Sequence, residues 1–231
     1  MGNSNSYNKK MSNSKDGFII CGTDTNVGKT LISAFLVQGL NATYWKPIQS
    51  GFEDGGDTFQ ISKILNLNKN RIIDEVYKLN TPVSPHWAAE IDNILIDQKH
   101  LKMPDHQNTI ILETAGGVMV PLRRNLLQID QIKEWGLPVI LIVRSGLGTL
   151  NHTFLTLESL RKRSIEIAGI IINGPKHKDN PKTIQEISDT NIIAEFPQLE
   201  FITAEILAKE WERQNLTKIF NELLNPKQSN V

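Results

Sequence analysis

The chain has little of what marks several protein classes. Its 231 residues include one cysteine, Cys21, and 25 basic residues balance 25 acidic ones. A lone cysteine excludes an intrachain disulfide and a cysteine-based metal cluster, and we expect it to be a small buried residue. Zero net charge gives no electrostatic reason to expect nucleic acid or an anionic membrane as partner. The apolar runs are shorter than a membrane span and residues 1–16 are too polar for a signal peptide, so we expect a cytoplasmic location.

Several site motifs are also missing from the sequence. The five histidines have no spacing typical of metal ligands, and no Gly-x-Ser-x-Gly segment suggests a hydrolase. No Gly-x-Gly-x-x-Gly segment follows the first apolar run, which disfavours a dinucleotide as ligand. These absences do not exclude a site for a mononucleotide.

Short apolar runs alternate with helical stretches along residues 17–225. Runs such as TIILE, PVILIV and IAGIII are apolar throughout, which is typical of parallel strands covered on both faces. We therefore predict a single doubly wound α/β domain of the P-loop NTPase type, with a mainly parallel sheet between helix layers. The polar residues 1–16 are predicted to be a disordered tail, and segment 74–108 to carry a helical excursion over the site. Strands are predicted at 18–22, 42–46, 109–113, 138–143, 167–173 and 191–195, and helices at 29–40, 57–65, 126–135, 149–163, 181–188 and 203–223.

The segment IICGTDTNVGKT at 19–30 predicts a phosphate-binding loop between a strand and a helix that begins at Lys29 and Thr30. Backbone N–H groups in such a loop surround phosphate oxygens, the lysine reaches the β- and γ-phosphates, and the threonine hydroxyl binds Mg²⁺. The common spacing would place the first glycine at Thr23, but the glycine is Gly22, so the loop is one residue longer. The segment predicts that the chain binds a nucleoside triphosphate.

Charged and polar residues follow the next two predicted strands. Lys46 and Ser50 lie just beyond the second strand, where a lysine near a phosphate loop can offset charge in phosphoryl transfer, although a solvated surface lysine is the alternative. Asp57 either caps a helix or binds Mg²⁺. Glu113 ends the third strand, and an acidic residue there typically holds the metal of a phosphate loop, directly or through water.

Two further turns could contact a ligand. The segment GLGTLNH places Thr149, Asn151 and His152 in the first turn of a helix, whose free N–H groups could bind an anion, although an ordinary loop and cap fits equally well. Asn173 ends the fifth strand, where its amide could bind the edge of an adenine. Both turns follow predicted parallel strands, at the end where ligands bind in this class of fold.

Taken together, these motifs resemble dethiobiotin synthetase from about residue 17 to residue 200. The resemblance rests on GTDTNVGKT, WKPIQSG, GDT, SPH at 84–86, ETAGG with VPL, GLGTLNH, IINGP and FPQL, which occur in that family's order. It implies an enzyme that uses ATP and Mg²⁺ to close a cyclic urea on 7,8-diaminononanoate with CO₂ or bicarbonate. It also implies a homodimer, because in this family a helix-start loop of the other subunit meets the substrate carboxylate.

The resemblance implies roles for individual residues. Lys46, which matches the family's active-site lysine, and Lys29 would offset the charge of carbamate and γ-phosphate, while Thr25 and Ser50 would contact the carbamylated diamine. Mg²⁺ would be held by Thr30, Asp57 and Glu113. Nucleotide binding would also involve Asn26, Val27, Gly28, Leu31, Thr114, Ala115, Gly116, Asn173, Gly174, Pro197, Gln198 and Leu199. The substrate would also contact Gly117 and, from the second subunit, Gly148, Thr149, Leu150 and Asn151.

The sequence departs from the family pattern at three positions. Asn26 stands where a glutamate is frequent, Thr114 replaces a flexible glycine, and Gly174 stands where an aspartate is common. An amide at Asn26 can form hydrogen bonds but cannot act as a base. The change at Gly174 leaves the nucleotide preference open.

Three alternatives share the nucleotide-binding motif. An amidoligase related to cobyrinate synthesis usually carries a second domain, for which the chain has no room. A nucleotide-switched partitioning ATPase has a second lysine early in the phosphate loop, whereas the loop of this chain contains no lysine before Lys29. A homologue that only binds nucleotide would not need Lys46, Ser50, Asp57 and Glu113 together.

Overall fold

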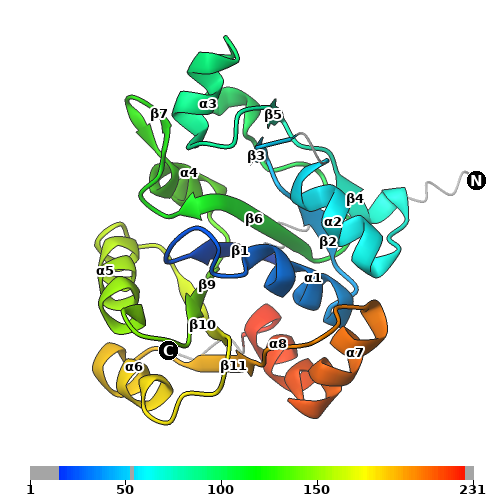
Figure 1. Cartoon of the computed structure of the whole chain (residues 1–231), viewed down its shortest axis with the longest axis vertical. Helices are drawn as coiled ribbons and strands as arrows, with labels where there is room; N and C mark the ends of the chain where they lie inside the picture. Colours follow the sequence, from blue (N-terminus) through cyan, green and yellow to red (C-terminus); the bar gives the residue numbers. More distant parts are fainter. Residues whose placement is uncertain (1–15, 53–54, 227–231) are drawn as a thin grey trace, which may run out of the picture.

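The computed structural model describes residues 16–52 and 55–226, in which helices and strands alternate along the chain (Figure 1). The predicted tail, apart from its last residue, lies outside the described residues. The central sheet contains β1 (Gly17–Gly22), β2 (Thr43–Trp45), β4 (Ile72–Ile73), β6 (Ile110–Gly117), β9 (Val139–Arg144), β10 (Ile167–Asn173) and β11 (Ile192–Phe196). The helices are α1 (Lys29–Gly39), α2 (Gly56–Leu65), α3 (Pro85–Ile91), α4 (Gln128–Trp135), α5 (Thr149–Lys162), α6 (Asn180–Ser188), α7 (Ala204–Arg213) and α8 (Leu216–Leu224).

Among the described residues, seven strands form one sheet in the order β11-β10-β9-β1-β6-β2-β4. Every neighbouring pair in it is parallel. The chain enters in the middle at β1 and winds toward both edges, which confirms the predicted doubly wound α/β class. All six predicted strands are present, although β6 continues past Glu113 to Gly117. Because the strands are parallel, their carboxyl ends lie along one edge of the sheet, and ligands bind there in this class of fold.

Apolar side chains cover both faces of the sheet. Phe18 and Ile20 of β1 pack on one face with residues of α1, α2, α7 and α8, whereas Ile19 and Cys21 pack on the other with residues of α3, α4, α5 and α6. Figure 1 shows α1, α2, α7 and α8 on the opposite side of the sheet from α4, α5 and α6. Cys21 is buried, as predicted. A shift of β1 by one residue would exchange the two layers, so the register of this central strand is strongly specified.

The C-terminal helix differs from the prediction. Instead of one helix at 203–223, α7 and α8 meet at a turn in which Asn215 has a φ of 53°. The turn lets the rings of Trp211 and Phe220 stack with centroids 5.0 Å apart, and Trp211 Nε1 donates to Thr217 Oγ1 at 2.9 Å. The prediction of a single helix was wrong because the apolar pattern continues across the turn, and periodicity alone does not reveal the left-handed residue.

The segment 74–108 contains α3, as the prediction of a helical excursion requires. Two short strands that were not predicted, β3 (Ile48–Ser50) and β5 (Tyr77–Leu79), form a parallel pair beside it. A hairpin of β7 (Pro121–Arg123) and β8 (Leu126–Leu127) precedes α4, so that helix begins at Gln128 rather than at residue 126. In the part of the chain that is described, no helix has the length and hydrophobicity to span a bilayer.

Candidate active site

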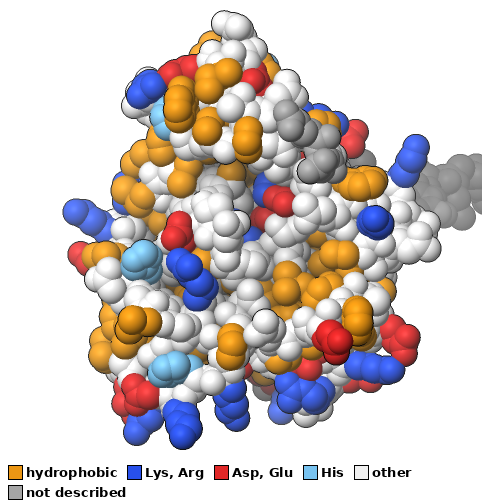
Figure 2. Space-filling model, in the orientation of Figure 1, with side chains coloured by type: hydrophobic (Ala, Val, Ile, Leu, Met, Phe, Trp, Pro, Cys, Tyr) orange, Lys and Arg blue, Asp and Glu red, His pale blue; other side chains and the backbone are white. Residues whose placement is uncertain are grey.

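A cleft of about 700 Å³ lies at the carboxyl ends of β1, β2 and β6. Figure 2 shows basic and acidic side chains next to one another in a hollow on this face. The cleft is lined by these predicted residues: Thr25, Asn26, Gly28, Lys29, Thr30, Lys46, Ser50, Asp57, Glu113, Ala115 and Gly116. The prediction that these strand ends meet at one site is therefore matched by their position in the structure. Gln49, residues 82–85 and Val120 complete the wall; none was named as a site residue, although 82–85 belong to the segment 74–108 that was predicted to lie over the site.

The phosphate loop connects β1 to α1, which begins at Lys29 as predicted. Gly28 has a φ of 93°, and a Cβ at this position would lie 2.0 Å from Asn173 Nδ2, so only glycine fits. The ammonium of Lys29 donates to the carbonyl oxygen of Asp24 at 3.0 Å, which ties the lysine to the tip of the loop. Burial lowers the pKa of Lys29, while the charge of Glu113 acts in the opposite direction.

Glu113 is only 1% exposed and forms the floor of the cleft. Its Oε1 accepts hydrogen bonds from Thr30 Oγ1 at 3.0 Å and from Lys46 Nζ at 3.2 Å, and its Oε2 accepts one from the Tyr44 hydroxyl at 2.9 Å. Burial raises the pKa of Glu113, but the charges of Lys46 and Lys29 and the hydrogen bonds to the carboxylate together outweigh it, so its pKa lies below the ordinary value. Glu113 is therefore a carboxylate at neutral pH.

Lys46 is buried, with 5% of its surface exposed, and contacts both Asp57 and Glu113. The alternative of a solvated surface lysine is therefore wrong. The alternative of Asp57 as a helix cap is also wrong, because α2 is capped by Gly55, with a φ of 81° and no side-chain cap hydrogen bond. The carboxylate of Asp57 instead faces Lys46, and the backbone N–H of Asp57 donates a hydrogen bond to Gln49 Oε1 at 3.1 Å.

The oxygen atoms of Thr30, Asp57 and Glu113 fit the chemistry of a Mg²⁺ site. The hydroxyl of Thr30 and the ammonium of Lys46 both donate hydrogen bonds to Glu113 Oε1. Lys46 also contacts the carboxylate of Asp57, so the side chains of Thr30, Asp57 and Glu113 lie around one position in the cleft. Mg²⁺ favours such ligands and usually completes its shell with water and substrate phosphates. The described residues contain no group of three or more His, Cys, Asp or Glu side chains able to hold a metal, so phosphate oxygens would be needed here.

Other predicted residues lie outside the cleft wall. Val27 is in the core. Thr114, one of the three departures from the family pattern, is buried within the sheet, where its hydroxyl donates a hydrogen bond to Ile20 O at 3.0 Å. Gly174 has a φ of 130°, and a Cβ there would lie 2.7 Å from Ser145 Oγ, so an aspartate would not fit this turn. The following predicted residues also do not line the cleft: Leu31, Gly117, Gly148, Thr149, Leu150, Asn151, Asn173, Pro197, Gln198 and Leu199.

Sequence reasoning missed three polar residues around the site: Tyr44, Gln49 and Gln128. Tyr44 lies in an apolar strand, where an aromatic residue indicates core packing. Gln49 lies within WKPIQSG, but that motif gave it no role of its own, and Gln128 belongs to none of the quoted motifs. The motif at 45–51 was a signal that could have identified Gln49, whereas no local pattern indicated Tyr44 or Gln128.

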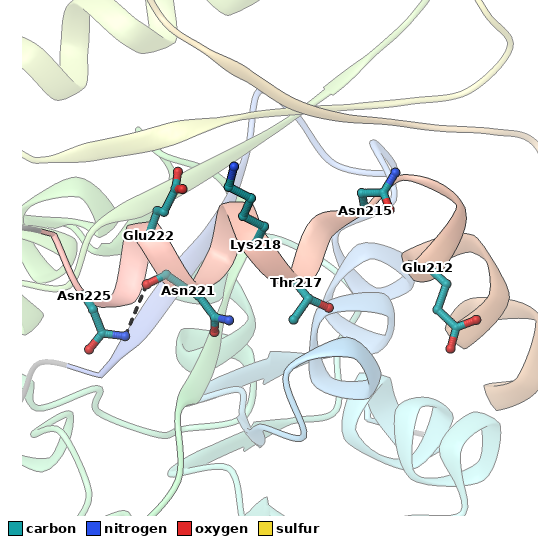
Figure 3. Close-up of a pocket in the computed structure, with 7 residues that line it drawn as sticks. All are labelled: Glu212, Asn215, Thr217, Lys218, Asn221, Glu222 and Asn225. Carbon is teal, nitrogen blue, oxygen red and sulfur yellow. Dashed lines mark hydrogen bonds between the residues drawn. The ribbon is translucent and has the colours of Figure 1, made fainter.

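A larger hollow lies along α8, away from the strand ends. Its volume is about 1220 Å³, and its lining residues are Glu212, Asn215, Thr217, Lys218, Asn221, Glu222 and Asn225. Figure 3 shows that these side chains spread along the helix rather than converge, and one hydrogen bond of 3.2 Å joins Asn225 Nδ2 to Asn221 O. The hollow contains no buried lysine or carboxylate comparable to Lys46 or Glu113, so the cleft beside the phosphate loop is the candidate site.

The parallel sheet, the loop after β1 and the buried Lys29 and Glu113 define a P-loop nucleotide-binding protein. A family model described as an AAA domain matches residues 16–206. Among curated relatives, the ATP-dependent dethiobiotin synthetase of Rhodopseudomonas palustris (strain BisB5) is 41% identical over 202 residues, which cover 87% of this chain and 95% of the relative. The corresponding protein of Brucella anthropi is 41% identical over 203 residues, covering 88% and 96%. The chain belongs to the dethiobiotin synthetase family.

A solved structure of a plasmid partition protein from Borrelia burgdorferi B31, bound to AMPPNP, has a TM-score of 0.52 to this chain at 17% identity. The match covers 90% of this chain and 99% of the other. At this level of identity the likeness concerns the fold alone.

Proposed function

We propose that the chain catalyses the ATP-dependent formation of dethiobiotin from 7,8-diaminononanoate and CO₂. As a member of its family, it is a ligase that forms carbon–nitrogen bonds and uses ATP. The observation that carries the proposal is one cleft that contains the loop lysine Lys29, the second lysine Lys46 and the hydroxyl of Ser50.

In the first half of the proposed reaction, one amine takes up CO₂ as a carbamate and releases a proton. The carbamate oxygen then attacks the γ-phosphate and ADP leaves, which gives a carbamic–phosphoric mixed anhydride. Both reactants are anionic, so Lys29 and Lys46 would offset their repulsion. The two ammonium groups are buried, so water screens their charge less than at the surface.

In the second half, the other amine attacks the carbonyl carbon, phosphate leaves, and the cyclic urea closes. Ser50 is suited to hold the carbamylated diamine, because its Oγ is buried and has no hydrogen-bond partner among the described residues. A buried hydroxyl without a hydrogen-bond partner lowers the stability of the fold, and a bound ligand could supply that partner. Thr25 lies at the exposed tip of the loop, on the wall of the same cleft.

Thr30, Asp57 and Glu113 would hold Mg²⁺, which when bound offsets negative charge on the phosphates. Glu113 is suited to this because its carboxylate is ionised and fixed on both oxygens. Among the described residues, the side chain of Asp57 bonds Lys46 alone, so its carboxylate can turn toward a metal.

The adenine would lie near the ends of β10 and β11, beside Asn173 and the segment 197–199. The Asn173 Nδ2 group donates to Val27 O at 2.9 Å and thereby joins this region to the phosphate loop. Within the described hydrogen bonds, the side-chain oxygen Oδ1 of Asn173 is left to accept from a ligand such as the adenine amino group. Gly28, Ala115 and Gly116 would lie along the phosphates.

A homodimer would complete the substrate site. Helix α5 begins at Thr149, after Gly148 with a φ of 87° as its N-cap residue. Residues 148–151 do not line the cleft of their own chain. Gly148 and Asn151 are exposed, and the buried Thr149 Oγ1 has no partner among the described residues. We infer that a second copy brings this helix start to the cleft, where its N–H groups would bind the substrate carboxylate.

The test is phosphate release from ATP and Mg²⁺ with bicarbonate, measured with and without 7,8-diaminononanoate, with the product identified by mass. The proposal expects release that requires the diamine and yields the cyclic urea. Release without the diamine would instead support a nucleotide-switched ATPase, which the 41% identity to synthetases does not favour. Nucleotide binding without any release would support a homologue that has lost catalysis.

A further inference from the structure

Strand β6 bulges where it passes the cleft. Ile20 of β1 pairs with Glu113, but Gly22, two residues further, pairs with Gly117. A single residue of β1 therefore lies opposite the segment 114–116 of β6. Bulges interrupt the ladder and change the direction of the backbone, and they occur frequently beside active sites. This bulge brings Ala115 and Gly116 into the wall of the cleft.

The side-chain amide of Gln128, the first residue of α4, spans the bulge. Its Oε1 accepts a hydrogen bond from the Ala115 N–H at 3.0 Å, and its Nε2 donates to Gly117 O at 2.9 Å. The backbone N–H of Gln128 donates to Val120 O at 2.9 Å, which fixes the start of the helix against the same segment. Gln128 is 2% exposed, so neither bond competes with bulk water.

The two bonds hold the N–H of Ala115 and the C=O of Gly117, the residues on either side of Gly116. This glycine has a φ of 65°, and a Cβ built on it would lie 3.1 Å from Val120 Cγ2 and 3.6 Å from Thr25 Oγ1. Gly116 thus lies close to the tip of the phosphate loop, and the distance between the two walls of the cleft depends on the shape of the bulge. The hydroxyl of Thr114 holds the bulge from the sheet side, through its bond to Ile20 O.

We propose that Gln128 is a positioning residue, which holds the β6 bulge so that Ala115 and Gly116 form a fixed wall against the reacting groups. The inference rests on the proposed function, in which these two residues lie along the phosphates. Gln128 itself does not line the cleft, so it acts through the backbone of β6. Misplacement of a contacting wall by about 1 Å can lower a rate on the order of 100-fold.

The test compares Gln128→Met with Gln131→Met. Gln131 lies on the same helix, is 1% exposed, and donates its Nε2 to a backbone carbonyl, Leu101 O, at 3.3 Å. It matches Gln128 in type and burial and also donates to a backbone carbonyl, but its Oε1 has no partner among the described residues and it makes no hydrogen bond to β6. Methionine keeps the length of the side chain and removes the amide.

The expected result is a kcat lowered roughly 10- to 100-fold in Gln128→Met, with the KM for ATP changed less, because wall geometry matters most in the transition state. The amide hydrogen of Ala115 should exchange at least about tenfold faster, since it loses its acceptor. Gln131→Met should keep both the wild-type kcat and the wild-type exchange rate at Ala115.

An Ala115 exchange rate equal to that of wild type, or a kcat equal to that of Gln131→Met, would overturn the proposal. If Gln128→Met does not fold, Gln128→Leu serves in the same assays, because it also removes both the acceptor for Ala115 and the donor to Gly117. A wild-type chain without diamine-dependent turnover would refute the proposed function, and the exchange rate at Ala115 would then decide alone whether Gln128 holds the bulge.

Discussion

The hydroxyl of Tyr44 donates a hydrogen bond of 2.9 Å to Glu113 Oε2, across the boundary between β2 and β6. The bond leaves Oε1 for Thr30 and Lys46, so each oxygen of the carboxylate has a fixed environment. Burial and the neighbouring charge of Glu113 raise the pKa of Tyr44 well above its ordinary value. The hydroxyl therefore stays protonated at physiological pH and remains a donor.

Replacement of Tyr44 by phenylalanine should weaken Mg²⁺-dependent catalysis. Glu113 Oε2 would be buried without a donor, which costs about 1–3 kcal/mol, and the carboxylate could turn away from the cleft. Loss of such a supporting bond typically lowers metal affinity roughly 10-fold or more, so the Mg²⁺ concentration for half-maximal turnover should rise by that factor. A Mg²⁺ titration of turnover measures this.

The matched control is Tyr77→Phe. Tyr77 is also buried, but its hydroxyl bonds Asp97 and His100, which do not line the cleft, instead of a cleft residue such as Glu113. This variant should lose stability and keep the Mg²⁺ dependence of the wild type. Equal Mg²⁺ dependence in Tyr44→Phe and Tyr77→Phe would show that Tyr44 has only a structural role.

Lys46→Ala should lower turnover by about a thousandfold, since it removes a buried positive charge from the proposed transition state. Nucleotide affinity in the presence of Mg²⁺ should remain within about threefold of wild type, because the loop and Lys29 still bind the phosphates. Steady-state turnover and a calorimetric titration with ATP would separate the two effects. Lys78→Ala, at a lysine whose side chain is 44% exposed, is the control. Turnover near the wild-type value would remove Lys46 from the mechanism.

The single thiol of the chain provides a test of the buried sheet. Burial raises the pKa of Cys21 from 9.0 to about 12, although a hydrogen bond with Thr114 and the charge of Lys29 lower it in part. The thiol of the folded chain should therefore not react with thiol reagents near pH 8, because the thiolate is the reactive form. Reaction should begin only as urea unfolds the chain, and a rapid reaction of the native chain would contradict the burial of β1.

The same pKa shift predicts how stability changes with pH. The folded chain keeps the proton of Cys21 up to about pH 12, whereas the unfolded chain loses it near pH 9.0. The contribution of this thiol to the free energy of unfolding is therefore fully present below pH 9 and decreases as the pH rises. Between about pH 8 and pH 11, wild type should lose about 2–3 kcal/mol more unfolding free energy than Cys21→Ala. Urea unfolding at both pH values measures the difference. Parallel losses in the two proteins would contradict the prediction.

The sequence was sufficient for the residues that end parallel strands. Lys46 and Glu113 could be placed at one site because strands covered on both faces are apolar throughout and their carboxyl ends must lie together. Tyr44 and Gln128 could not be placed in this way. Their roles depend on which strand pairs with which and on how α4 packs against β6, and these contacts have no local pattern.

The turn between α7 and α8 illustrates the same limit. Asn215 has a φ of 53°, a conformation that asparagine and glycine adopt more easily than other residues. Asn215→Gly should therefore change the unfolding free energy by less than about 0.5 kcal/mol, whereas Asn215→Val should lower it by about 1–2 kcal/mol through backbone strain. Urea denaturation of both variants tests this. A neutral valine substitution would mean that the helices do not turn at this residue.

Thr30→Val tests the metal site from the side of the phosphate loop. Valine keeps the shape of the side chain but removes the hydroxyl that contacts Glu113 Oε1 at 3.0 Å. Binding of ATP with Mg²⁺ should weaken roughly 10- to 100-fold, while binding in the presence of EDTA should be unchanged, because the loop backbone is intact. Since Thr30 and Tyr44 hold the two oxygens of one carboxylate, the combined variant Thr30→Val/Tyr44→Phe should cost less than the sum of its parts. A coupling of about 0.5 kcal/mol or more in this cycle would show that both residues act through Glu113, and strict additivity would show that they act separately.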